Sequence, residues 1–325
     1  MRHAWVIYNP YAGRFPAGPL LKRAAGVLDR AGWKIRVVES HAGQDLTALA
    51  SEAVDLGCDA VFVAGGDGSV GRVAGALAGT KTALAVLPAG TANVWAKELG
   101  LPQLGWITPL ALEEAARRLA HGQIRVVDIA TCDGTPFLLW AGVGLDGKVV
   151  NSIEPRERWE KAFAVAHYAM SAVWESLDWT GMDLRVTANG QTWSDHFLLA
   201  VASNIRAYAG GFLELSPEAK LDDGLLDVWL LPGRSIRDAI SIAVQILMGR
   251  HIDSPEVVYF QSSEVTIEAD SSLPMHLDGE PQHVGQRALL SVQRRMLKVL
   301  VPEGGWPDAS NSLEPPITNA ADVLE

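Results

Sequence analysis

The first third of the chain alternates between short apolar runs and segments with helical spacing, and this alternation strongly constrains the fold. The apolar runs, rich in Val, Ile and Leu, cover residues 4–8, 34–39, 60–64 and 82–87. Between them, residues 20–31, 45–56 and 69–78 have apolar side chains at helix-compatible spacing. Strands that are apolar along their length and alternate with helices form a parallel sheet covered on both faces. The sequence therefore predicts an α/β domain.

After about residue 118 the pattern changes to short strands separated by turn signals such as Asp133-Gly134 and Asn189-Gly190. We expect an antiparallel β domain that two helical stretches, 155–177 and 235–248, interrupt. The expected strands are 124–131, 137–142, 184–188, 193–203, 225–231, 256–259, 264–268 and 288–292.

We place the α/β domain at residues 1–127 and the β-rich domain at residues 128–295. Two domains are also the better expectation for a chain of 325 residues. Residues 303–325 are turn-rich and acidic, which predicts a disordered tail.

Composition limits the partners and the compartment. The formal net charge of −11 argues against bulk binding of nucleic acid. No apolar run approaches the ~20 residues that a membrane-spanning helix needs, and the N-terminus resembles a strand more than a signal peptide. Two cysteines, Cys58 and Cys132, form no disulfide framework and fit small buried side chains in a reducing compartment. We therefore expect a cytoplasmic protein.

Three polar loops that contain glycine follow strands of the expected parallel sheet. They are Asn9-Pro10-Tyr11-Ala12-Gly13, Gly65-Gly66-Asp67-Gly68-Ser69 and Pro88-Ala89-Gly90-Thr91-Ala92-Asn93. The carboxyl ends of parallel strands meet at one edge of the sheet, where ligands bind in such folds. The sequence therefore predicts one site built from all three loops.

The loop around Asp67 combines features of a phosphate-binding loop with an acid. Gly65 and Gly66 lack the Cβ atoms that would block a phosphate, and Gly68-Ser69 leads into a helix whose N-terminus favours an anion. Asp67 fits beside phosphate if a divalent cation lies between them or if the carboxylate binds a hydroxyl group. We interpret Asp67 as part of a site for Mg²⁺ and a nucleotide. The alternative is a turn aspartate that caps the helix.

The loop sequences NPYAG, GGDGS and PAGTAN, in this order, resemble the diacylglycerol kinase catalytic family, which includes soluble bacterial lipid kinases and relatives of sphingosine and ceramide kinases. The resemblance continues through SNIRAYAGGF, PEAKLDDGLLDV and MHLDGEP, so it covers roughly residues 4–302. It implies a nucleotide-binding α/β domain, a β-sandwich-like lipid domain and an active site in the cleft between them. It also implies that the last ordered segment, 296–302, returns to the first domain.

The same resemblance implies that ATP and Mg²⁺ are the cofactors. It makes Glu280 the base that accepts the proton of the attacking lipid hydroxyl, with Asp67 and Asp278 as further catalytic carboxylates. For the Asp-Gly-Glu triplet alone, a solvated hairpin tip is the alternative. The implied nucleotide-binding residues are Asn9, Pro10, Tyr11, Ala12, Gly13, Ser40, Gly65, Gly66, Asp67, Gly68, Ser69, Val70, Gly71, Arg72, Gly90, Thr91 and Asn93.

A second metal site is implied by the stretch from Lys220 to Leu225. In the family pattern the carbonyls of Lys220 and Leu225 and the carboxylate of Asp223 hold a structural Mg²⁺. An ordinary turn that opens the next strand is the alternative. Asp128 belongs, by the same resemblance, to a network of acids and waters between that ion and the active site.

The chain departs from the family at two places in these loops. Gly71 and Arg72 stand where the family usually has an amide and a glutamate, and Val94 stands where an aspartate usually follows Asn93. Two interpretations stay open. Either Arg72 contacts phosphate itself and activity persists with altered metal dependence, or the chain has lost efficient catalysis.

The favoured function is an ATP-dependent lipid kinase that acts on diacylglycerol or a long-chain base presented at a membrane surface. A kinase of a soluble substrate and a lipid- or nucleotide-binding regulator are the alternatives. Apolar residues recur every three or four positions in 159–177, with Arg156, Arg158 and Lys161 at the start of that stretch. This amphipathic helix either packs on its own sheet or gives the protein peripheral contact with the inner face of the membrane.

Overall fold

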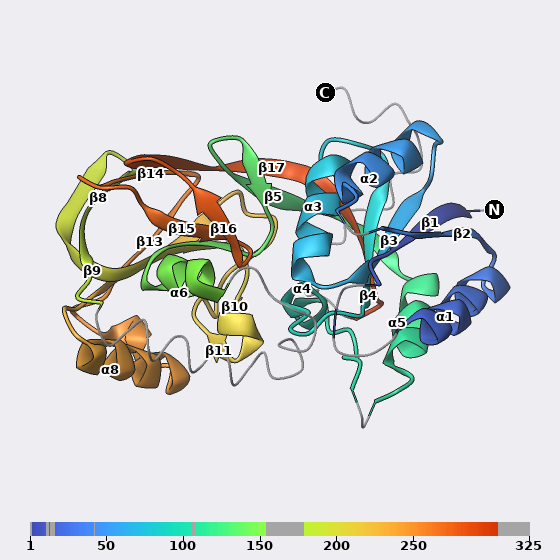
Figure 1. The fold of residues 1–325 in the computed structure, drawn as a ribbon, viewed down its shortest axis with the longest axis horizontal. Coiled ribbons are helices and arrows are strands. Elements are labelled where there is room, and N and C mark those ends of the chain that lie inside the picture. The colour runs from blue at the N-terminus through green and yellow to red at the C-terminus, as the bar shows by residue number, and fades with distance from the viewer. Residues whose placement is uncertain are drawn as a thin grey trace.

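The computed structural model describes residues 2–10, 13, 17–41, 43–105, 108–153 and 179–304 (Figure 1). The helix expected at 155–177 and nearly all of the expected tail lie outside these residues, as do Tyr11 and Ala12. Among the described residues no helix is long and apolar enough to cross a membrane.

The N-terminal domain contains the parallel sheet that the sequence predicts. Its strands are β1 (Arg2–Tyr8), β2 (Trp33–Glu39), β3 (Ala60–Gly65) and β4 (Ala83–Pro88), which pair in the order β4-β3-β1-β2. β3 and β4 are buried at every position, which explains why their apolar runs are continuous.

Helices cover both faces of this sheet. α1 (Gly18–Arg30) packs against α5 (Ala111–Ala120) on one face, and α2 (Leu46–Asp55) packs against α3 (Asp67–Leu77) on the other (Figure 1). The short α4 (Val94–Glu98) follows β4. The side chain of Asp45 caps α2 by accepting the N–H of Thr47 at 2.9 Å. The helices α4 and α5 were not predicted from the sequence.

The second domain is built from antiparallel strands, as predicted. Its strands are β5 (Gln123–Cys132), β6 (Thr135–Phe137), β7 (Trp140–Gly144), β8 (Met182–Ala188), β9 (Gln191–Ser203), β12 (Leu226–Pro232), β13 (Val258–Ser262), β14 (Glu264–Glu268), β15 (Pro274–Leu277), β16 (Glu280–His283) and β17 (Arg287–Val301). The remaining elements are α6 (Leu145–Ile153), α8 (Ile236–Leu247), the two-strand ribbon β10 (Ala207–Tyr208) and β11 (Leu213–Glu214), and the 3-10 turns η2 (Ala209–Gly211) and η3 (His251–Asp253). The helix expected at 235–248 corresponds to α8.

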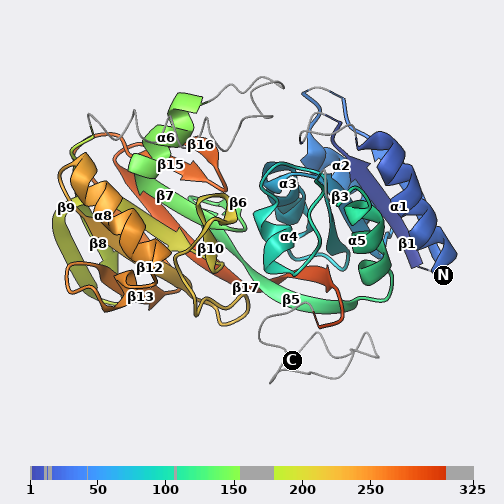
Figure 2. The same cartoon turned by 90° about the horizontal axis from the view of Figure 1, so that it is seen from below.

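The strand β17 joins the two domains (Figure 2). It pairs with β14 and β5 in the second domain, and Val299 near its end pairs with Leu84 of β4 in the parallel sheet. The strand predicted at residues 288–292 is therefore shorter than the observed strand β17. Its register with β5 shifts between Gln293 and Leu297, where Arg295 has a φ of +53° and interrupts the alternation of side chains.

The single strand expected at 137–142 is two strands, β6 and β7, with a break at Leu138 and Leu139. The backbone N–H groups of these two residues donate to the carboxylate of Asp278, at 2.8 Å each. The break therefore places an acidic side chain of one hairpin at the base of another strand, next to the site described below.

Candidate active site

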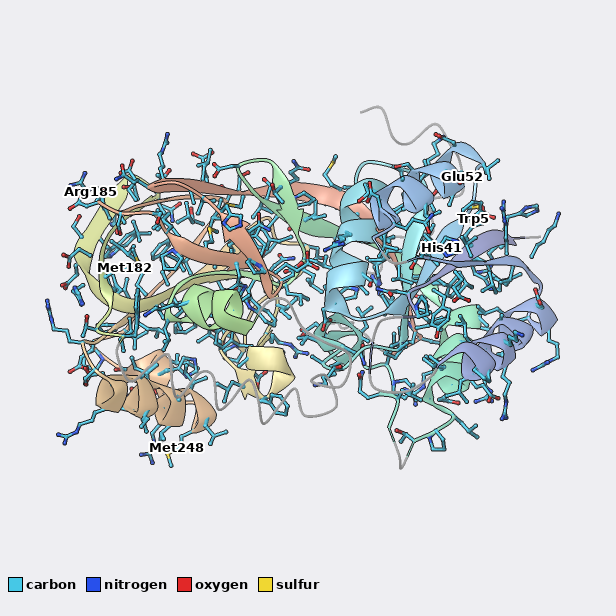
Figure 3. The ribbon with its side chains drawn as sticks, viewed as in Figure 1. Trp5, His41, Glu52, Met182, Arg185 and Met248 are labelled. Atoms are coloured by element: carbon cyan, nitrogen blue, oxygen red, sulfur yellow. The ribbon has the colours of Figure 1, made fainter. Side chains whose placement is uncertain are left out.

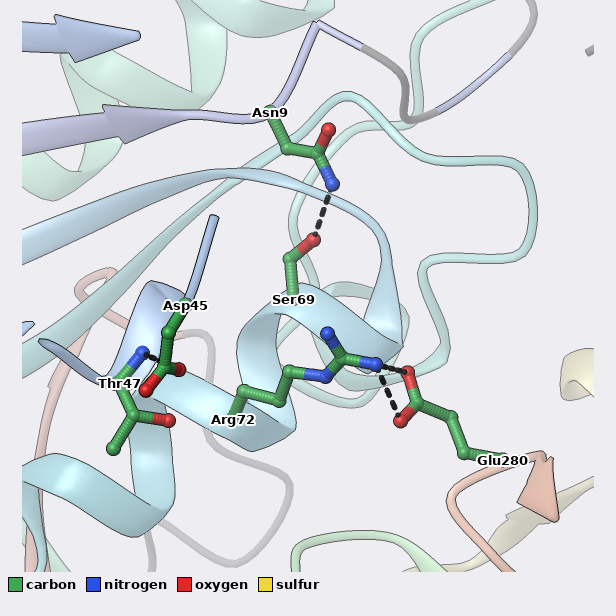
Figure 4. Close-up of polar contacts among 6 residues, drawn as sticks. All are labelled: Asn9, Asp45, Thr47, Ser69, Arg72 and Glu280. Atoms are coloured by element: carbon green, nitrogen blue, oxygen red, sulfur yellow. Dashed lines mark hydrogen bonds and ion pairs between the residues drawn. The ribbon is translucent and has the colours of Figure 1, made fainter. Parts of the chain in front are cut away.

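The three glycine-bearing loops of the N-terminal domain lie against one another. The side-chain amide of Asn9 donates to the hydroxyl of Ser69 at 3.1 Å (Figure 4). Gly13 has a φ of +74°, and a Cβ at this residue would collide with the carbonyl of Ala89. A Cβ at Gly90 would likewise collide with the backbone of Gly66. The loops after β1, β3 and β4 therefore form one surface at the carboxyl edge of the sheet.

Ser40 lies at the end of the neighbouring strand β2. It is buried, and its hydroxyl donates to the carbonyl of Tyr8 at 3.2 Å. This contact places Ser40 directly beside the start of the loop at Asn9.

Asp67 begins α3, but its carboxylate caps a different helix. The oxygen Oδ1 accepts the backbone N–H of Trp95 at 3.1 Å, in the first turn of α4. Burial raises the pKa of Asp67, and the N–H groups of Val94 and Trp95 and the nearby ammonium of Lys97 oppose that rise. Asp67 thus ties the loop after β3 to the loop after β4.

The next loop is held by its own side chains. Asn93 has a φ of +48°, accepts the N–H of Gly90 at 2.8 Å and donates to the carbonyl of Gly90 at 3.1 Å. Val94, one of the two departures from the family pattern, is buried in the core and contributes its backbone N–H to Asp67. Thr91, between Gly90 and Asn93, is half-buried. The side chain of Asn93 therefore shapes this loop rather than projecting from it.

Glycines on α3 let the second domain approach the helix closely. A Cβ at Gly68 would lie 2.5 Å from Oε1 of Glu280, and a Cβ at Gly71 would lie 2.9 Å from Oδ2 of Asp278. One turn further on, a Cβ at Gly75 would meet the ring of Pro136 at 2.5 Å. The missing side chain at Gly71 therefore leaves room for the carboxylate of Asp278. Val70 lies on the buried side of the same helix, so its side chain belongs to the core.

Asp278 occupies the turn between β15 and β16, with a φ of +52°. Its carboxylate accepts three backbone N–H groups, those of Leu138 and Leu139 at 2.8 Å and that of Trp140 at 3.2 Å. Burial, and to a smaller extent the charge of Asp67, raise the pKa of Asp278 to about 6, although the three N–H groups act to lower it. Electrostatic coupling therefore connects the two predicted carboxylates across the domain boundary.

Glu280 forms an ion pair with Arg72. The nitrogen Nη2 of Arg72 lies 3.0 Å from Oε1 and 2.9 Å from Oε2 of Glu280 (Figure 4). The arginine that departs from the family pattern is thus the direct partner of the predicted base. From the sequence, only phosphate was expected as the ligand of Arg72.

A buried network lies behind the Asp-Gly-Glu triplet. Nε2 of His276 and the hydroxyl of Tyr208 both lie 2.6 Å from Oδ2 of Asp146, and all three side chains are buried. The backbone N–H of Gly279 donates to Nδ1 of His276 at 3.2 Å. Because Nδ1 accepts, the ring hydrogen is assigned to Nε2, which then donates to Asp146. The network fixes the backbone between Asp278 and Glu280.

This network was not predicted, although Tyr208 and His276 lie within the segments SNIRAYAGGF and MHLDGEP. Lys97, whose ammonium donates to the carbonyl of Gly210 at 3.1 Å, was not predicted either. Next to it, Arg206 pairs with the buried Glu98 at 2.9 Å. These contacts join α4 to the second domain beside the site.

The loop predicted to hold a structural Mg²⁺ lies beside Asp128. Asp128 is fully buried, accepts the N–H of Gly224 and the N–H of Arg295, each at 2.6 Å, and donates its own N–H to the carbonyl of Leu221. Asp223 accepts the N–H of Leu225 at 3.0 Å. The loop therefore packs onto the strand that carries Asp128.

The donor set of this loop fits a hard cation. Burial raises the pKa of both Asp128 and Asp223, and repulsion from the neighbouring acids, including Asp222, raises both further. A bound cation would relieve that repulsion, and Mg²⁺ prefers carboxylate and carbonyl oxygens. Among the described residues no group of three His, Cys, Asp or Glu side chains could hold a metal, so any ion here depends on the backbone carbonyls of Lys220 and Leu225.

Comparison with known proteins gives matches over both domains. A family model for the diacylglycerol kinase catalytic domain matches residues 3–132, and one for the YegS C-terminal NAD kinase beta sandwich-like domain matches residues 141–301. A probable lipid kinase YegS-like protein of Chromohalobacter salexigens is 31% identical over 92% of this chain and 93% of its own. A diacylglycerol kinase of Mycobacterium tuberculosis is 31% identical over 85% and 87%. A crystal structure of a diacylglycerol kinase from Bacillus anthracis superposes with a TM-score of 0.69, at 21% identity, over 93% of this chain and 98% of that one.

Proposed function

The chain belongs to the diacylglycerol kinase catalytic-domain family, a family of lipid kinases, and we propose that it transfers the γ-phosphoryl group of ATP to the hydroxyl of a lipid. Diacylglycerol and a long-chain base are the proposed acceptors. One observation carries the proposal. The carboxylate of Glu280 lies over Gly68, at the N-terminus of the helix that the glycine-rich loop opens.

The nucleotide is assigned to the surface formed by the three loops. The N-terminus of α3 favours the phosphates, because its first backbone N–H groups point away from the helix. Gly66 and Gly90 keep the loop backbones in contact and free of side chains at this point. A divalent cation bound with the nucleotide would supply positive charge at the phosphates, and we assign Asp67 as the carboxylate that would bind it.

Glu280 is assigned as the base. A base must lie where it can receive the proton of the attacking hydroxyl, and the edge of the phosphate loop is such a place. Arg72 holds the carboxylate there, and the contacts of Asp278 and Gly279 fix the backbone on which Glu280 is carried. The lipid would enter between the domains, and once bound it would keep away the water that would otherwise hydrolyse ATP.

The carboxylate of Asp223 and the carbonyls of Lys220 and Leu225 are assigned to a structural Mg²⁺. A cation there would stabilise the folded loop against which Asp128 packs. No residue of this loop is assigned to the chemical step.

A second candidate, a lipid- or nucleotide-binding regulator without turnover, is favoured by the ion pair between Arg72 and Glu280, since an occupied carboxylate is a poorer base. One assay separates the candidates. The protein is incubated with Mg²⁺, ATP labelled in the γ-phosphoryl group and detergent-dispersed diacylglycerol, long-chain base or water-soluble alcohols. The proposal is supported if the wild type transfers the label to a lipid and Glu280→Gln does not. Label only in soluble alcohols would assign a soluble substrate, and binding of ATP without label transfer would assign the regulator.

A further inference from the structure

The helix α8 carries apolar side chains on two faces, and the fold buries only one of them. Ile246 is buried and Ile242 half-buried, where the helix packs toward β11. Ile240, Val244 and Leu247 are exposed by 57%, 43% and 69%. An apolar face of a helix ordinarily packs against another part of the structure, and, as far as the structure describes the chain, the second apolar face of α8 does not.

The exposed residues form one continuous stripe. Positions 240, 244, 247 and 248 follow the i, i+4, i+7, i+8 spacing of a single helical face. Met248, just after the helix, is 60% exposed and points away from the body of the protein (Figure 3). Ile252 in the following turn, η3, is 50% exposed. Scattered apolar residues are normal on a surface, but a contiguous stripe marks a place where something binds.

Arginines flank the helix at both ends. Residues 233–250 contain Arg234, Arg237 and Arg250 against one acid, Asp238, and the exposed acids Asp253 and Glu256 follow after Ile252. Asp238 is engaged in the start of the helix, where it accepts the N–H of Arg234 at 2.8 Å and the hydroxyl of Ser235 at 3.0 Å. Within the part of the chain that the structure describes, none of the three arginines forms an ion pair. The helix therefore offers an apolar stripe with cations at both ends.

We propose that α8 docks the protein on a bilayer surface that contains anionic lipid. The stripe would lie in the boundary between headgroups and acyl chains, and the arginines would meet lipid phosphates. This inference rests on the proposed function, because a kinase of membrane lipids must reach its substrate at a bilayer.

A second copy of the chain fits the surface less well. A symmetric dimer through the stripe would set α8 of one copy against α8 of the other. The arginines stand at both ends of the helix, so either direction of pairing brings guanidinium groups together, and only Asp253 beyond Arg250 would offset their repulsion. Anionic lipid offers the opposite charge.

Contacts connect this surface to the active site. α8 packs against β11, which pairs with β10 and follows the turn η2. The carbonyl of Gly210 in that turn accepts a hydrogen bond from the ammonium of Lys97 in α4. The same ammonium lies 5.4 Å from the ring centroid of Phe212, a side chain that is 62% exposed. Tyr208 in β10 belongs to the network behind Glu280. A bilayer that contacts α8 would therefore lie next to elements that support the catalytic triplet.

The test measures co-sedimentation of the full chain with phosphatidylcholine vesicles that contain phosphatidylglycerol. The variant I240S/L247S should bind at least about tenfold more weakly, since it removes two side chains that would be buried in the interface. The control is Leu56→Ser, which changes a residue of similar exposure (61%) in the N-terminal domain and should bind as the wild type does. Arg237→Gln should weaken binding to anionic vesicles and leave binding to pure phosphatidylcholine vesicles unchanged. Thermal unfolding shows whether each variant is folded.

Kinase assays separate this inference from the proposed function. I240S/L247S should phosphorylate detergent-dispersed lipid at the wild-type rate and lose activity on vesicles. Wild-type-like vesicle binding by that variant overturns the docking surface, even if lipid is phosphorylated. A wild-type dimer that the same substitutions dissociate, without any effect on vesicle binding, would assign the stripe to a second copy. Vesicle binding through α8 with no lipid phosphorylated would support the surface and refute the kinase.

Discussion

The guanidinium of Arg72 and the carboxylate of Glu280 meet at 2.9 Å across the boundary between the two domains. Both side chains keep substantial contact with water, at 54% and 38% exposure. An ion pair between exposed groups contributes only about 0–1 kcal/mol, because water screens the attraction and two long side chains lose freedom. The pair therefore orients Glu280 without locking it, and a bound substrate can displace the arginine.

Arg72→Gln tests what the arginine does. If Arg72 acts by orienting Glu280, kcat falls while the KM for ATP stays near the wild-type value. We expect the free energy of unfolding to change by less than about 1 kcal/mol. Steady-state kinetics and urea unfolding measure both, with Arg30→Gln at the exposed end of α1 as the control. A raised KM for ATP with unchanged kcat would instead make phosphate the ligand of Arg72.

Asp67→Asn should abolish phosphoryl transfer and leave the protein at least as stable near pH 7.5. Burial raises the pKa of Asp67, so the ionised carboxylate costs stability above that pKa. Asparagine removes the charge and keeps an oxygen for the N–H of Trp95. Lipid phosphorylation and the melting temperature are the two measurements. Near-normal turnover would remove Asp67 from the nucleotide site.

The sequence predicted the nucleotide domain well because its elements depend on local pattern. β3 and β4 are buried at every position, so their apolar runs identify them without other information. Parallel strands also end at one edge of the sheet. For this reason the sequence predicted that the loops that carry Asn9, Ser69 and Gly90 lie together. α5 was missed although the signal was present, with acids in its first turn, arginines in its last and an apolar stripe between them.

The contacts between the domains could not be predicted in this way. Asp278 lies 140 positions from Leu138, and no periodic pattern records that their backbones meet. The pairing of Arg72 with Glu280 depends on how the β domain packs on α3, which is decided by glycines at Gly68 and Gly71 rather than by the charged residues themselves. α4 has only five residues and is too short for a periodic signal.

Asp223→Ala should lower the melting temperature mainly when Mg²⁺ is present. A ligand that binds only the folded state stabilises it by an amount that grows with ligand concentration. The wild type should therefore melt higher in Mg²⁺ than in chelator, and the variant should lose that difference. Asp270→Ala is the control, because Asp270 is an exposed acid of the same domain that lies outside this loop. If Asp223→Ala lowers the melting temperature, relative to the wild type, by the same amount in Mg²⁺ and in chelator, the loop is an ordinary turn.

Asp278→Asn should change how stability depends on pH. The pKa of Asp278 is raised to about 6 in the folded protein, so the folded state holds this proton more tightly than the unfolded chain. The proton bound to Asp278 stabilises the folded state. This stabilisation is complete below the unfolded pKa of about 3.9 and is lost as the pH rises through about 6. The melting temperature of the wild type relative to that of the variant should therefore fall across this window. Asp55→Asn on α2 serves as the comparison, and parallel melting curves for wild type and Asp278→Asn would contradict the assignment.

Glu280→Gln should leave the binding of ATP with Mg²⁺ unchanged and lower kcat for lipid phosphorylation by two or more decades. Glutamine keeps the size and hydrogen-bonding capacity of the side chain above Gly68, but it cannot accept the proton of the lipid hydroxyl. A general base contributes about 10²–10⁴ in rate, equivalent to about 3–5 kcal/mol of barrier. Nucleotide affinity is measured by calorimetry. Turnover is measured with detergent-dispersed lipid, so that docking on a bilayer plays no part. Glu264→Gln, an exposed glutamate on β14 of the same domain, should behave as the wild type. A normal kcat would exclude Glu280 from the chemical step, whereas a loss of ATP affinity would move it, with Arg72, to the nucleotide-binding surface.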